Sequence, residues 1–285
     1  VEAADASGAA ALHAAYQAVA GGSADVTLVV GVEKMTDRLP DAAEAGLATG
    51  SQGDYEAAQG ITAMAQSAML MQRYLHQYGL EVGDFAAFPV NAHRNAAANP
   101  FAMYRNQVTE KAYRQAKMVA TPINLLDGAP LADGAAAVVL VATDHARALG
   151  HVGIRVLAST LATDSVALTD RDDVLSLGAA RRSADAAYTH AGLSPEAVDV
   201  AELHDAYSIL AALSLEACGF AARGQGIKLG QTGDIGREGR IPIATLGGFK
   251  ARGNPVGASG LYQAVEIVTQ LRGGVAEREI PFAKS

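Results

Sequence analysis

The sequence has little of what marks secreted, membrane-spanning or nucleic-acid-binding proteins. Among its 285 residues there is one cysteine, Cys218, which cannot form an intrachain disulfide or a cysteine-rich zinc site. The 22 basic residues are outnumbered by 30 acidic ones, and a net charge of -8 provides no general basic surface for nucleic acid or an anionic membrane. The chain also lacks an apolar run of about 20 residues and a secretory signal at its first residues. These absences predict a cytoplasmic protein without a membrane span.

Alanine, glycine and aliphatic residues are abundant instead. Hydrophobic residues make up 50% of the chain and charged residues 18%, and 30 residues are glycine. This composition is typical of a globular protein in which helices pack closely against sheets. The length allows one large domain or two of ordinary size. We therefore expect the α/β class.

Periodicity and glycine positions divide the chain into helices and strands. Helices are predicted where apolar residues recur at helical spacing, at residues 9–20, 61–78, 174–191 and 258–272. Strands are predicted in short β-branched runs at 26–33, 135–142, 154–160 and 199–203, and the first of these is expected to be buried on both faces. Residues 37–130 are less regular and predict a mainly helical excursion that covers a site, with its methionines in the core.

One internal repeat links the two ends of the chain. Ala6-Ser7-Gly8 precedes a helix that ends at Gly21-Gly22, and Ala258-Ser259-Gly260 precedes a helix that ends at Gly273-Gly274, with the same spacing. The repeat indicates either two related buried helices, one from each half of the chain, or a coincidence in an alanine- and glycine-rich sequence.

Several longer motifs resemble those of one family. The segments VEAADASG, VVGVEKMT, ADGAAAVVL, VAELHDAYS, GGFKARGNPVGASG and QLRGG follow the order and spacing of the thiolase superfamily. They are most similar to its archaeal-type and sterol-carrier-type members, the thiolase-like lipid-transfer proteins. The resemblance covers nearly the whole chain.

The resemblance implies a fold and a domain division. In the thiolase fold, two similar βαβαβαββ halves stack as an αβαβα sandwich. Residues 1–150 would then be the N-terminal half, with the covering region at about 37–130, and residues 151–285 the C-terminal half. The family also implies a chain truncated at both ends and a homodimer or larger assembly.

The same resemblance assigns four residues to the catalytic positions of the family. Asp5 stands where a thiolase has its nucleophilic cysteine, and Asn254 where it has the histidine of a GHP motif, so both of those groups are missing. His204 of the HD motif is retained, and Tyr207 stands where related enzymes often have phenylalanine. All four are candidate catalytic residues. The glycine loop provides the candidate substrate-binding residues Gly247, Gly248, Gly253, Gly257 and Ser259.

Each candidate also has a structural interpretation. Asp5 at a helix start suits an N-cap, because its carboxylate can accept free backbone N–H groups. His204 and Tyr207 suit packing in a strand-to-helix turn, and Asn254 precedes a proline as in many turns. Cys218 is predicted to be a core thiol. No histidine shows a ligand spacing, so no metal is expected.

Chemistry limits what this set of residues can do. A carboxylate is a far weaker nucleophile towards a thioester than a thiolate, and Asn254 cannot shuttle a proton, although its amide can donate to an oxyanion. We therefore predict an acyl-CoA enzyme that cleaves a carbon–carbon bond without an acyl-enzyme, by retro-aldol cleavage of a β-hydroxyacyl-CoA with Tyr207 and His204 as acid and base. Thiolytic acetyl-CoA acyltransfer and a non-catalytic lipid- or acyl-CoA-binding subunit are the alternatives.

The expected ligand is the coenzyme A thioester itself, as substrate and without a cofactor. Arg94, Arg105, Lys111 and Lys117 lie in the covering region, but no motif assigns the phosphates of coenzyme A to them. The aldolases that the sequence resembles act with a small partner that carries an OB fold and a zinc ribbon. A partner of that kind is therefore expected here.

Overall fold

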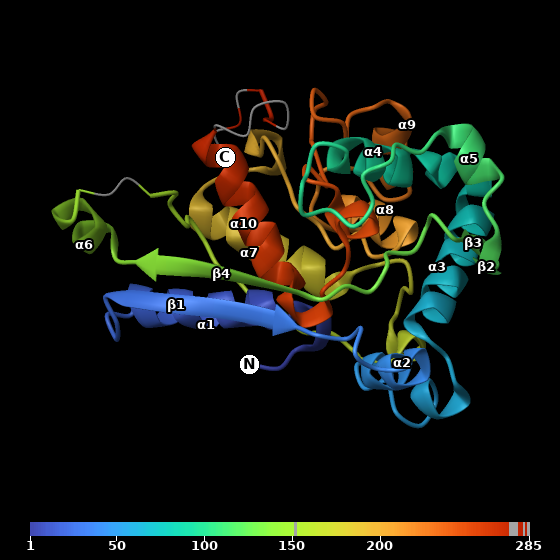
Figure 1. The fold of residues 1–285 in the computed structure, drawn as a ribbon, viewed down its shortest axis with the longest axis horizontal. Coiled ribbons are helices and arrows are strands. Elements are labelled where there is room, and N and C mark those ends of the chain that lie inside the picture. The colour runs from blue at the N-terminus through green and yellow to red at the C-terminus, as the bar shows by residue number, and fades with distance from the viewer. Residues whose placement is uncertain (151–152, 274–278, 282, 284–285) are drawn as a thin grey trace.

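The computed structural model describes residues 1–150, 153–273, 279–281 and 283, and the second glycine of the C-terminal repeat, Gly274, lies outside them. The fold is mixed α/β (Figure 1). The helices are α1 (Ser7–Ala20), α2 (Pro40–Ala48), α3 (Ala63–Tyr78), α4 (Ala87–Ala96), α5 (Glu110–Arg114), α6 (Thr143–Ala148), α7 (Gly178–Ala191), α8 (Ser208–Ala217), α9 (Gly226–Gln231) and α10 (Ser259–Arg272). The strands are β1 (Val26–Glu33), β2 (Met118–Ala120), β3 (Ile123–Asn124) and β4 (Gly134–Val141).

Strands β1 and β4 pair antiparallel, with Val30 opposite Ala137, and form a sheet along one side of the molecule (Figure 1). The strands predicted at 26–33 and 135–142 are thereby confirmed. Side chains alternate between the two faces of a strand, and one face of β1 packs on α1 and α10. On this face, a Cβ added to Gly31 would lie 3.0 Å from Leu261 Cδ1.

The other face of β1 is open in the described structure. Leu28, Val30 and Val32 are 67%, 57% and 70% exposed. The prediction that this strand is buried on both faces is therefore wrong for the described residues. The physical reason is that α1 and α10 cover one face of the sheet, and no other described element covers the opposite one.

Helices α1 and α10 lie against each other and confirm the helices predicted at 9–20 and 258–272. Each begins with Ser-Gly directly after a 3₁₀ turn, Ala4–Ala6 before α1 and Val256–Ala258 before α10. A Cβ on Gly8 would come within 2.9 Å of the Gly257 carbonyl oxygen, and a Cβ on Gly260 within 2.5 Å of the Ala9 nitrogen. The two helices can approach this closely because both crossing positions are glycine, which supports the interpretation of the repeat as two related helices.

A hydrophobic core is built around α3, α4 and α8. Tyr74, Phe85 and Ile209 are fully buried there, and the Tyr74 hydroxyl donates to the Glu216 carboxylate at 2.6 Å. The helix predicted at 61–78 is confirmed as α3. The methionines of α3 are not all in the core as predicted. Met71 is buried there, whereas Met69 is 48% exposed.

Two predicted strands do not form in the described structure. Residues 154–160 have no assigned secondary structure and pair with no described strand, and of residues 199–203 only Ala201 forms a bridge, with Ile243. An extended segment becomes a strand only where neighbouring chain satisfies its backbone donors and acceptors. The helix predicted at 174–191 is present as α7 but begins at Gly178.

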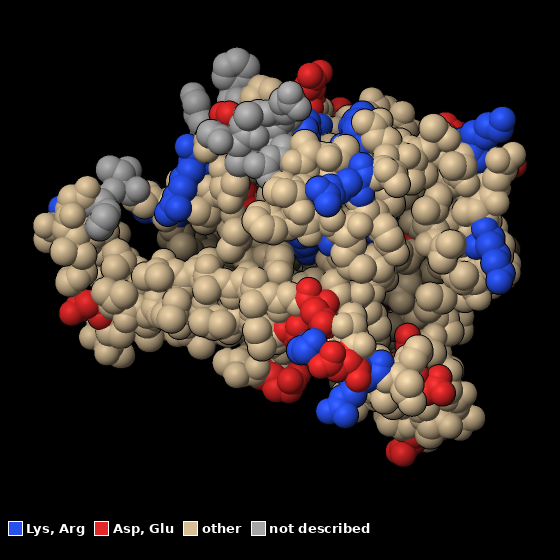
Figure 2. All heavy atoms as spheres, viewed as in Figure 1, with Lys and Arg blue, Asp and Glu red and all other residues tan. Residues whose placement is uncertain are grey.

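The surface is unevenly charged. The area over β1 and β4 carries few charged side chains, whereas acidic and basic side chains gather near the C-terminal end of β1 (Figure 2). Lys34 forms ion pairs there with Asp37 at 2.9 Å and Asp133 at 3.2 Å. Within the part of the chain that the structure describes, no helix combines the length and apolar character needed to cross a membrane.

Candidate active site

Three segments that are distant in the sequence meet near the N-terminal ends of α1 and α10. They are the turn Ala4–Ala6, the segment 204–207 that leads into α8, and the glycine loop at 247–257. The turn Ala4–Ala6 packs on the turn Val256–Ala258, and the Phe249 N–H of the loop donates to Asp205 Oδ1 at 2.7 Å. The four candidate catalytic residues belong to these three segments.

Asp5 lies inside the 3₁₀ turn Ala4–Ala6 and is partly exposed. The N-cap of α1 is Ala6, which makes no side-chain cap, so the interpretation of Asp5 as the cap of this helix is wrong. Ser7 closes the turn instead, because its hydroxyl accepts from the Ala3 N–H at 2.8 Å and donates to the Ala4 carbonyl at 2.7 Å. The Asp5 carboxylate remains near Tyr207, whose titration it influences.

Tyr207 stands directly before α8, where its backbone forms a bridge with Gly128. Its ring lies over that glycine, since a Cβ at Gly128 would be 3.5 Å from Tyr207 Cε1. Burial, together with the carboxylates of Glu44 and Asp5, raises the pKa of Tyr207 to about 12. The phenol is therefore protonated at neutral pH and suited to donate a proton rather than accept one.

His204 is half-buried at the start of the same segment. Its ring packs edge-to-face on Phe249 of the glycine loop, with ring centroids 4.9 Å apart. The Arg252 guanidinium also lies over the Phe249 ring, 5.2 Å from its centroid. The loop thus fixes the plane of the imidazole through an apolar contact.

Asn254 is buried, and its side-chain amide has a fixed orientation. Oδ1 accepts from the Ser259 hydroxyl at 2.9 Å and from the Val256 N–H at 3.1 Å. Because a backbone N–H can only donate, the oxygen of the amide must face these groups. The Nδ2 group is thereby turned away from them and is the part of Asn254 that can donate to an incoming oxygen.

The glycine loop takes backbone conformations that side chains disfavour. Gly247 and Gly253 both have φ near 114°, and Gly248 has φ 52°. A Cβ on Gly248 would clash with the Asp205 carboxylate, and one on Gly253 would lie 2.7 Å from Met103 Sδ. These residues must therefore be glycine for the loop to lie against the segments on either side of it.

Two other predicted substrate-binding residues already have partners. The Gly257 N–H donates to Glu33 Oε2 at 3.2 Å, and the Ser259 hydroxyl donates to Asn254. Both groups therefore organise the site in this structure, and substrate contact through them stays a prediction.

Backbone strain concentrates around the same loop. The non-glycine residues with positive φ among the described residues are Ala4, Ala244 and Val256, at 49°, 51° and 30°. Ala4 precedes Asp5, Ala244 lies three residues before the glycine loop, and Val256 lies near its end. Such conformations cost free energy and are typical of functional sites.

Sequence reasoning missed two residues of this region. Lys250 lies within the glycine loop and is buried, and Glu44 of α2 lies close enough to Tyr207 to raise its pKa. The only signal for Lys250 was a cation between a phenylalanine and an alanine in a loop of small residues. Glu44 lies on an exposed helix position far from any motif, so the sequence held no signal for it.

Cys218 is the only cysteine of the chain and lies outside this region. It follows α8 at the opposite end from Tyr207, and its carbonyl accepts from the Tyr188 hydroxyl at 2.8 Å. Burial and the nearby Asp185 carboxylate raise the pKa of Cys218 to about 11, which disfavours the reactive thiolate.

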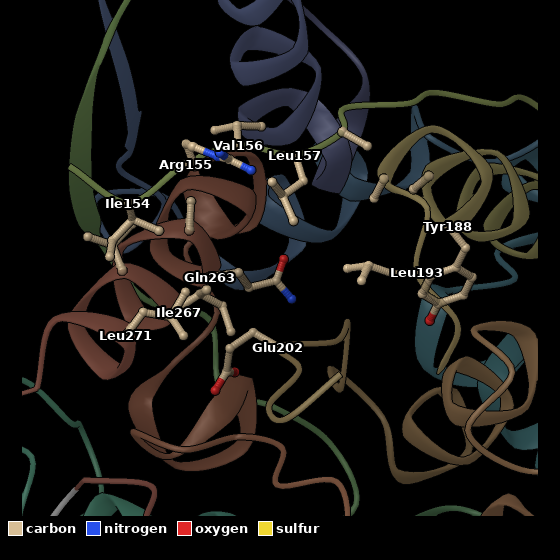
Figure 3. A pocket seen from close by; sticks show the side chains of 15 residues that line it. Ile154, Arg155, Val156, Leu157, Tyr188, Leu193, Glu202, Gln263, Ile267 and Leu271 are labelled. Atoms are coloured by element: carbon tan, nitrogen blue, oxygen red, sulfur yellow. The ribbon is translucent and has the colours of Figure 1, made fainter. Parts of the chain in front are cut away.

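An apolar hollow of about 430 Å³ lies in another part of the molecule, between residues 154–158, α7 and α10 (Figure 3). Ile154, Leu157, Leu193 and Ile267 line it together with Glu202. None of the four candidate catalytic residues is among the described residues that line it. The hollow is therefore separate from the candidate active site.

The described residues contain no group of three or more His, Cys, Asp or Glu side chains arranged to hold a metal ion. The cationic residues of the covering region, Arg94, Arg105, Lys111 and Lys117, are all exposed. Their contact with coenzyme A phosphates stays a prediction.

The structure shows a mixed α/β fold in which the four candidate residues lie on segments that meet, and comparison with known proteins supplies its family. A family model described as "Thiolase, N-terminal domain" matches residues 1–144, and one described as "Thiolase C-terminal domain-like" matches residues 160–285. The chain belongs to the thiolase family and has the thiolase fold, as its motifs predict.

Individual relatives agree with this assignment. Acetyl-CoA acetyltransferase of Methanothermobacter thermautotrophicus is 40% identical over 284 residues, which cover 100% of this chain and 74% of the relative. Benzoylsuccinyl-CoA thiolase subunit BbsB of Thauera aromatica is 32% identical, with 95% of this chain and 70% of the relative covered. Sterol carrier protein 2 of Homo sapiens is 29% identical, with 98% of this chain and 53% of the relative covered.

A solved structure described as an Ltp2-ChsH2(DUF35) aldolase is also similar. It superposes with a TM-score of 0.79 and 25% sequence identity, over 94% of this chain and 70% of that chain. Relatives named as acyltransferases and as an aldolase therefore share this fold.

Proposed function

We propose that the protein cleaves a carbon–carbon bond of a β-hydroxyacyl-CoA by a retro-aldol reaction. The observation that carries the proposal is the absence of a thiol from the site. The only cysteine of the chain follows the far end of α8, and the position that resembles the thiolase nucleophile is Asp5. An acyl-cysteine intermediate, on which thiolytic transfer depends, has no residue to form on.

The residues at the site suit a reaction that passes through an enolate. His204 removes the proton of the β-hydroxyl group, the bond between the α and β carbons breaks, and a ketone or aldehyde leaves. The electron pair of that bond becomes the thioester enolate, whose oxygen accepts from Asn254 Nδ2. Tyr207, protonated because its pKa is about 12, donates a proton to the α carbon and regains one from His204 through solvent. The products are a carbonyl compound and a shortened acyl-CoA.

Asp5 has a supporting role in this scheme. A carboxylate is a poor thioester nucleophile, and an anhydride formed on it would hydrolyse. Its negative charge near Tyr207 instead stabilises the neutral phenol and so preserves the proton that the reaction needs.

A protein partner is part of the proposal. The similar aldolase structure is named as a complex of Ltp2 with ChsH2(DUF35), and we propose that this chain also acts with a small protein of OB fold and zinc ribbon. A homodimer is proposed from the family resemblance.

Acetyl-CoA acyltransfer is the second candidate, because the relative that is 40% identical carries the name acetyl-CoA acetyltransferase. It requires Asp5 to replace a thiolate. Its distinguishing result is therefore thiolysis of a 3-ketoacyl-CoA by free coenzyme A that disappears in an Asp5→Ala variant.

The test uses the full chain with its co-purified or co-expressed partner and a panel of β-hydroxyacyl-CoA thioesters, with the released ketone or aldehyde measured. We expect cleavage without added coenzyme A, and a loss of about 10²–10⁴-fold in kcat for Tyr207→Phe and for His204→Ala. Tyr55→Phe is the matched control, since Tyr55 is 74% exposed and outside the site.

Two results would contradict the proposal. One is thiolysis of 3-ketoacyl-CoA at a rate comparable to that of an ordinary thiolase. The other is a lack of cleavage of every thioester in the presence of the partner, which would favour a non-catalytic acyl-CoA-binding subunit.

A further inference from the structure

Among the described lysines, Lys250 alone is buried, with 2% of its surface exposed. It belongs to the π-helical turn Gly248–Arg252 in the middle of the glycine loop. The proposed reaction does not use it. Burying an ammonium group without a function is costly, because the charge leaves water for a medium of lower dielectric constant.

The ammonium group has one specific partner. Lys250 Nζ donates to the Asp127 carbonyl oxygen at 2.5 Å. The same oxygen accepts from the Ser208 N–H at 3.1 Å, at the first residue of α8. One carbonyl thus joins the glycine loop to the helix that Tyr207 precedes.

The Asp127 segment is itself rigid. Its carboxylate accepts from the Tyr113 hydroxyl at 2.9 Å and from the Asn124 N–H at 3.0 Å. Asp127 is fully buried. The carbonyl that Lys250 contacts therefore has little freedom to move.

Tyr207 rests on the next residues of that segment. Its backbone forms the bridge with Gly128, the Ala129 N–H donates to the Ala206 carbonyl at 2.8 Å, and its ring lies over Gly128. A shift of the Asp127 carbonyl would therefore carry the ring with it.

We propose that Lys250 is the positioning residue of Tyr207, acting through the Asp127 carbonyl and Gly128. The adjacent Phe249 contacts the other end of the segment 204–207, because its N–H donates to Asp205 and its ring packs on His204. Two consecutive residues of the π-helical turn thus set the positions of both proposed acid–base groups. This inference rests on the proposed function for its kinetic consequence, and on geometry alone for its structural one.

The charged state of Lys250 is accessible to titration. Burial lowers the pKa of Lys250 to about 8, although the carboxylates of Asp205 and Asp127 oppose this shift. The other titratable groups that face this cluster are His93 of α4, whose pKa burial and the charge of Lys250 lower, and Tyr113 of α5, whose pKa burial and Asp127 raise. Loss of the proton near pH 8 replaces a charge-assisted hydrogen bond by a weaker neutral one.

The first test does not depend on activity. The chain is labelled with ring-¹³Cε tyrosine, and the Tyr207 resonance is assigned by its loss in Tyr207→Phe. We expect the wild-type Tyr207 resonance to shift with a midpoint near pH 8, and we expect this step to vanish in Lys250→Met and in Lys250→Arg. Lys228→Met is the matched control, because Lys228 is exposed on α9, and it should retain the step.

The second test uses the retro-aldol assay. We expect Lys250→Met to lower kcat about 10²-fold, as displaced catalytic groups do, with KM changed less than about threefold. Lys250→Arg should recover part of this loss and remove the alkaline limb near pH 8 from the kcat profile.

The outcomes separate the two proposals. A Tyr207 resonance that keeps its wild-type position in both Lys250→Met and Lys250→Arg overturns the role of Lys250, and Lys250→Arg decides the question if Lys250→Met fails to fold. A resonance that responds as expected in a protein inactive on every β-hydroxyacyl-CoA leaves the positioning contact standing and overturns the proposed function instead. An active Lys250→Met variant with unchanged kcat and an unchanged alkaline limb also contradicts the positioning role.

Discussion

The carboxylate of Glu202 lies beside that of the buried Glu266, and it accepts from the Thr245 N–H at 2.7 Å and the Thr245 hydroxyl at 2.8 Å. Burial and the charge of Glu266 raise the pKa of Glu202 well above its usual range. A raised pKa in the folded state means that the protonated acid stabilises the fold. This contribution is complete below the unfolded pKa of about 4.3 and is lost as the pH rises through the folded pKa.

Replacing Glu202 by glutamine should therefore stabilise the protein in a pH-dependent way. The amide imitates the protonated acid at every pH, so Glu202→Gln should be more stable than the wild type near neutral pH and differ little from it near pH 4. Urea unfolding at pH 4, 6 and 8 measures the difference. Equal differences at the three pH values would contradict the raised pKa, and the exposed Glu238→Gln serves as the control.

The residues of the candidate site could be predicted where they belong to a recognisable motif. Asp5, His204, Tyr207 and Asn254 were recognised from their neighbours in the sequence, and the structure assigns them to segments that meet. Lys250 could not be predicted, because its proposed role depends on a hydrogen bond to the Asp127 backbone carbonyl. Every residue has a backbone carbonyl, so the sequence does not indicate which one is the partner.

At the scale of elements, α10 and the glycine loop are joined by a buried ion pair. Arg252 Nη1 lies 2.5 Å from Glu266 Oε1, and the two side chains are 4% and 3% exposed. The Arg252 guanidinium also lies over the Tyr262 ring, 4.9 Å from its centroid. The pair connects the middle of α10 to the loop that contains Lys250.

Removing one partner should be much worse than removing both. Glu266→Ala removes the hydrogen-bonded partner of the buried Arg252 charge, and we expect it to lower the free energy of unfolding by about 3–5 kcal/mol. The double variant Arg252→Met with Glu266→Met should lose far less, because no buried charge remains. Chemical denaturation of both variants and of the exposed control Glu196→Ala tests this. A double variant as unstable as Glu266→Ala would contradict the explanation.

Helices and strands differed in how well the sequence predicted them. The helices at 9–20, 61–78 and 258–272 follow from apolar periodicity, which is a local property. The segments 154–160 and 199–203 have strand-like composition, yet strand formation depends on partners elsewhere in the chain. Composition does not encode whether those partners are in place.

At the scale of the whole molecule, the most unusual surface is the open face of the β1–β4 sheet. Leu28, Val30 and Val32 of β1 and Val139 of β4 are all more than half exposed on it. Charged side chains are scarce over these strands (Figure 2). Apolar patches of this kind usually contact another protein surface.

This face should make the chain associate with itself. We expect sedimentation velocity to show a sedimentation coefficient that rises with protein concentration, and we expect Val30→Lys to lower that rise because it adds a charge to the patch. Gln72→Lys adds the same charge at an exposed position of α3 and should leave the association unchanged. Association that is equal in both variants would show that another surface is responsible.

The crossing of α1 and α10 also bears on the symmetry of the chain. Gly8 of one helix meets the start of the other, and Gly260 meets Ala9 in return, which is the reciprocal contact that a twofold axis produces. A pair of identical half-length chains would make the same contact, but each would then present the same side chain at its helix start. Within one chain that constraint is absent, and by the register of the repeat Asp5 stands before α1 where Gly257 stands before α10, so the two helix starts differ.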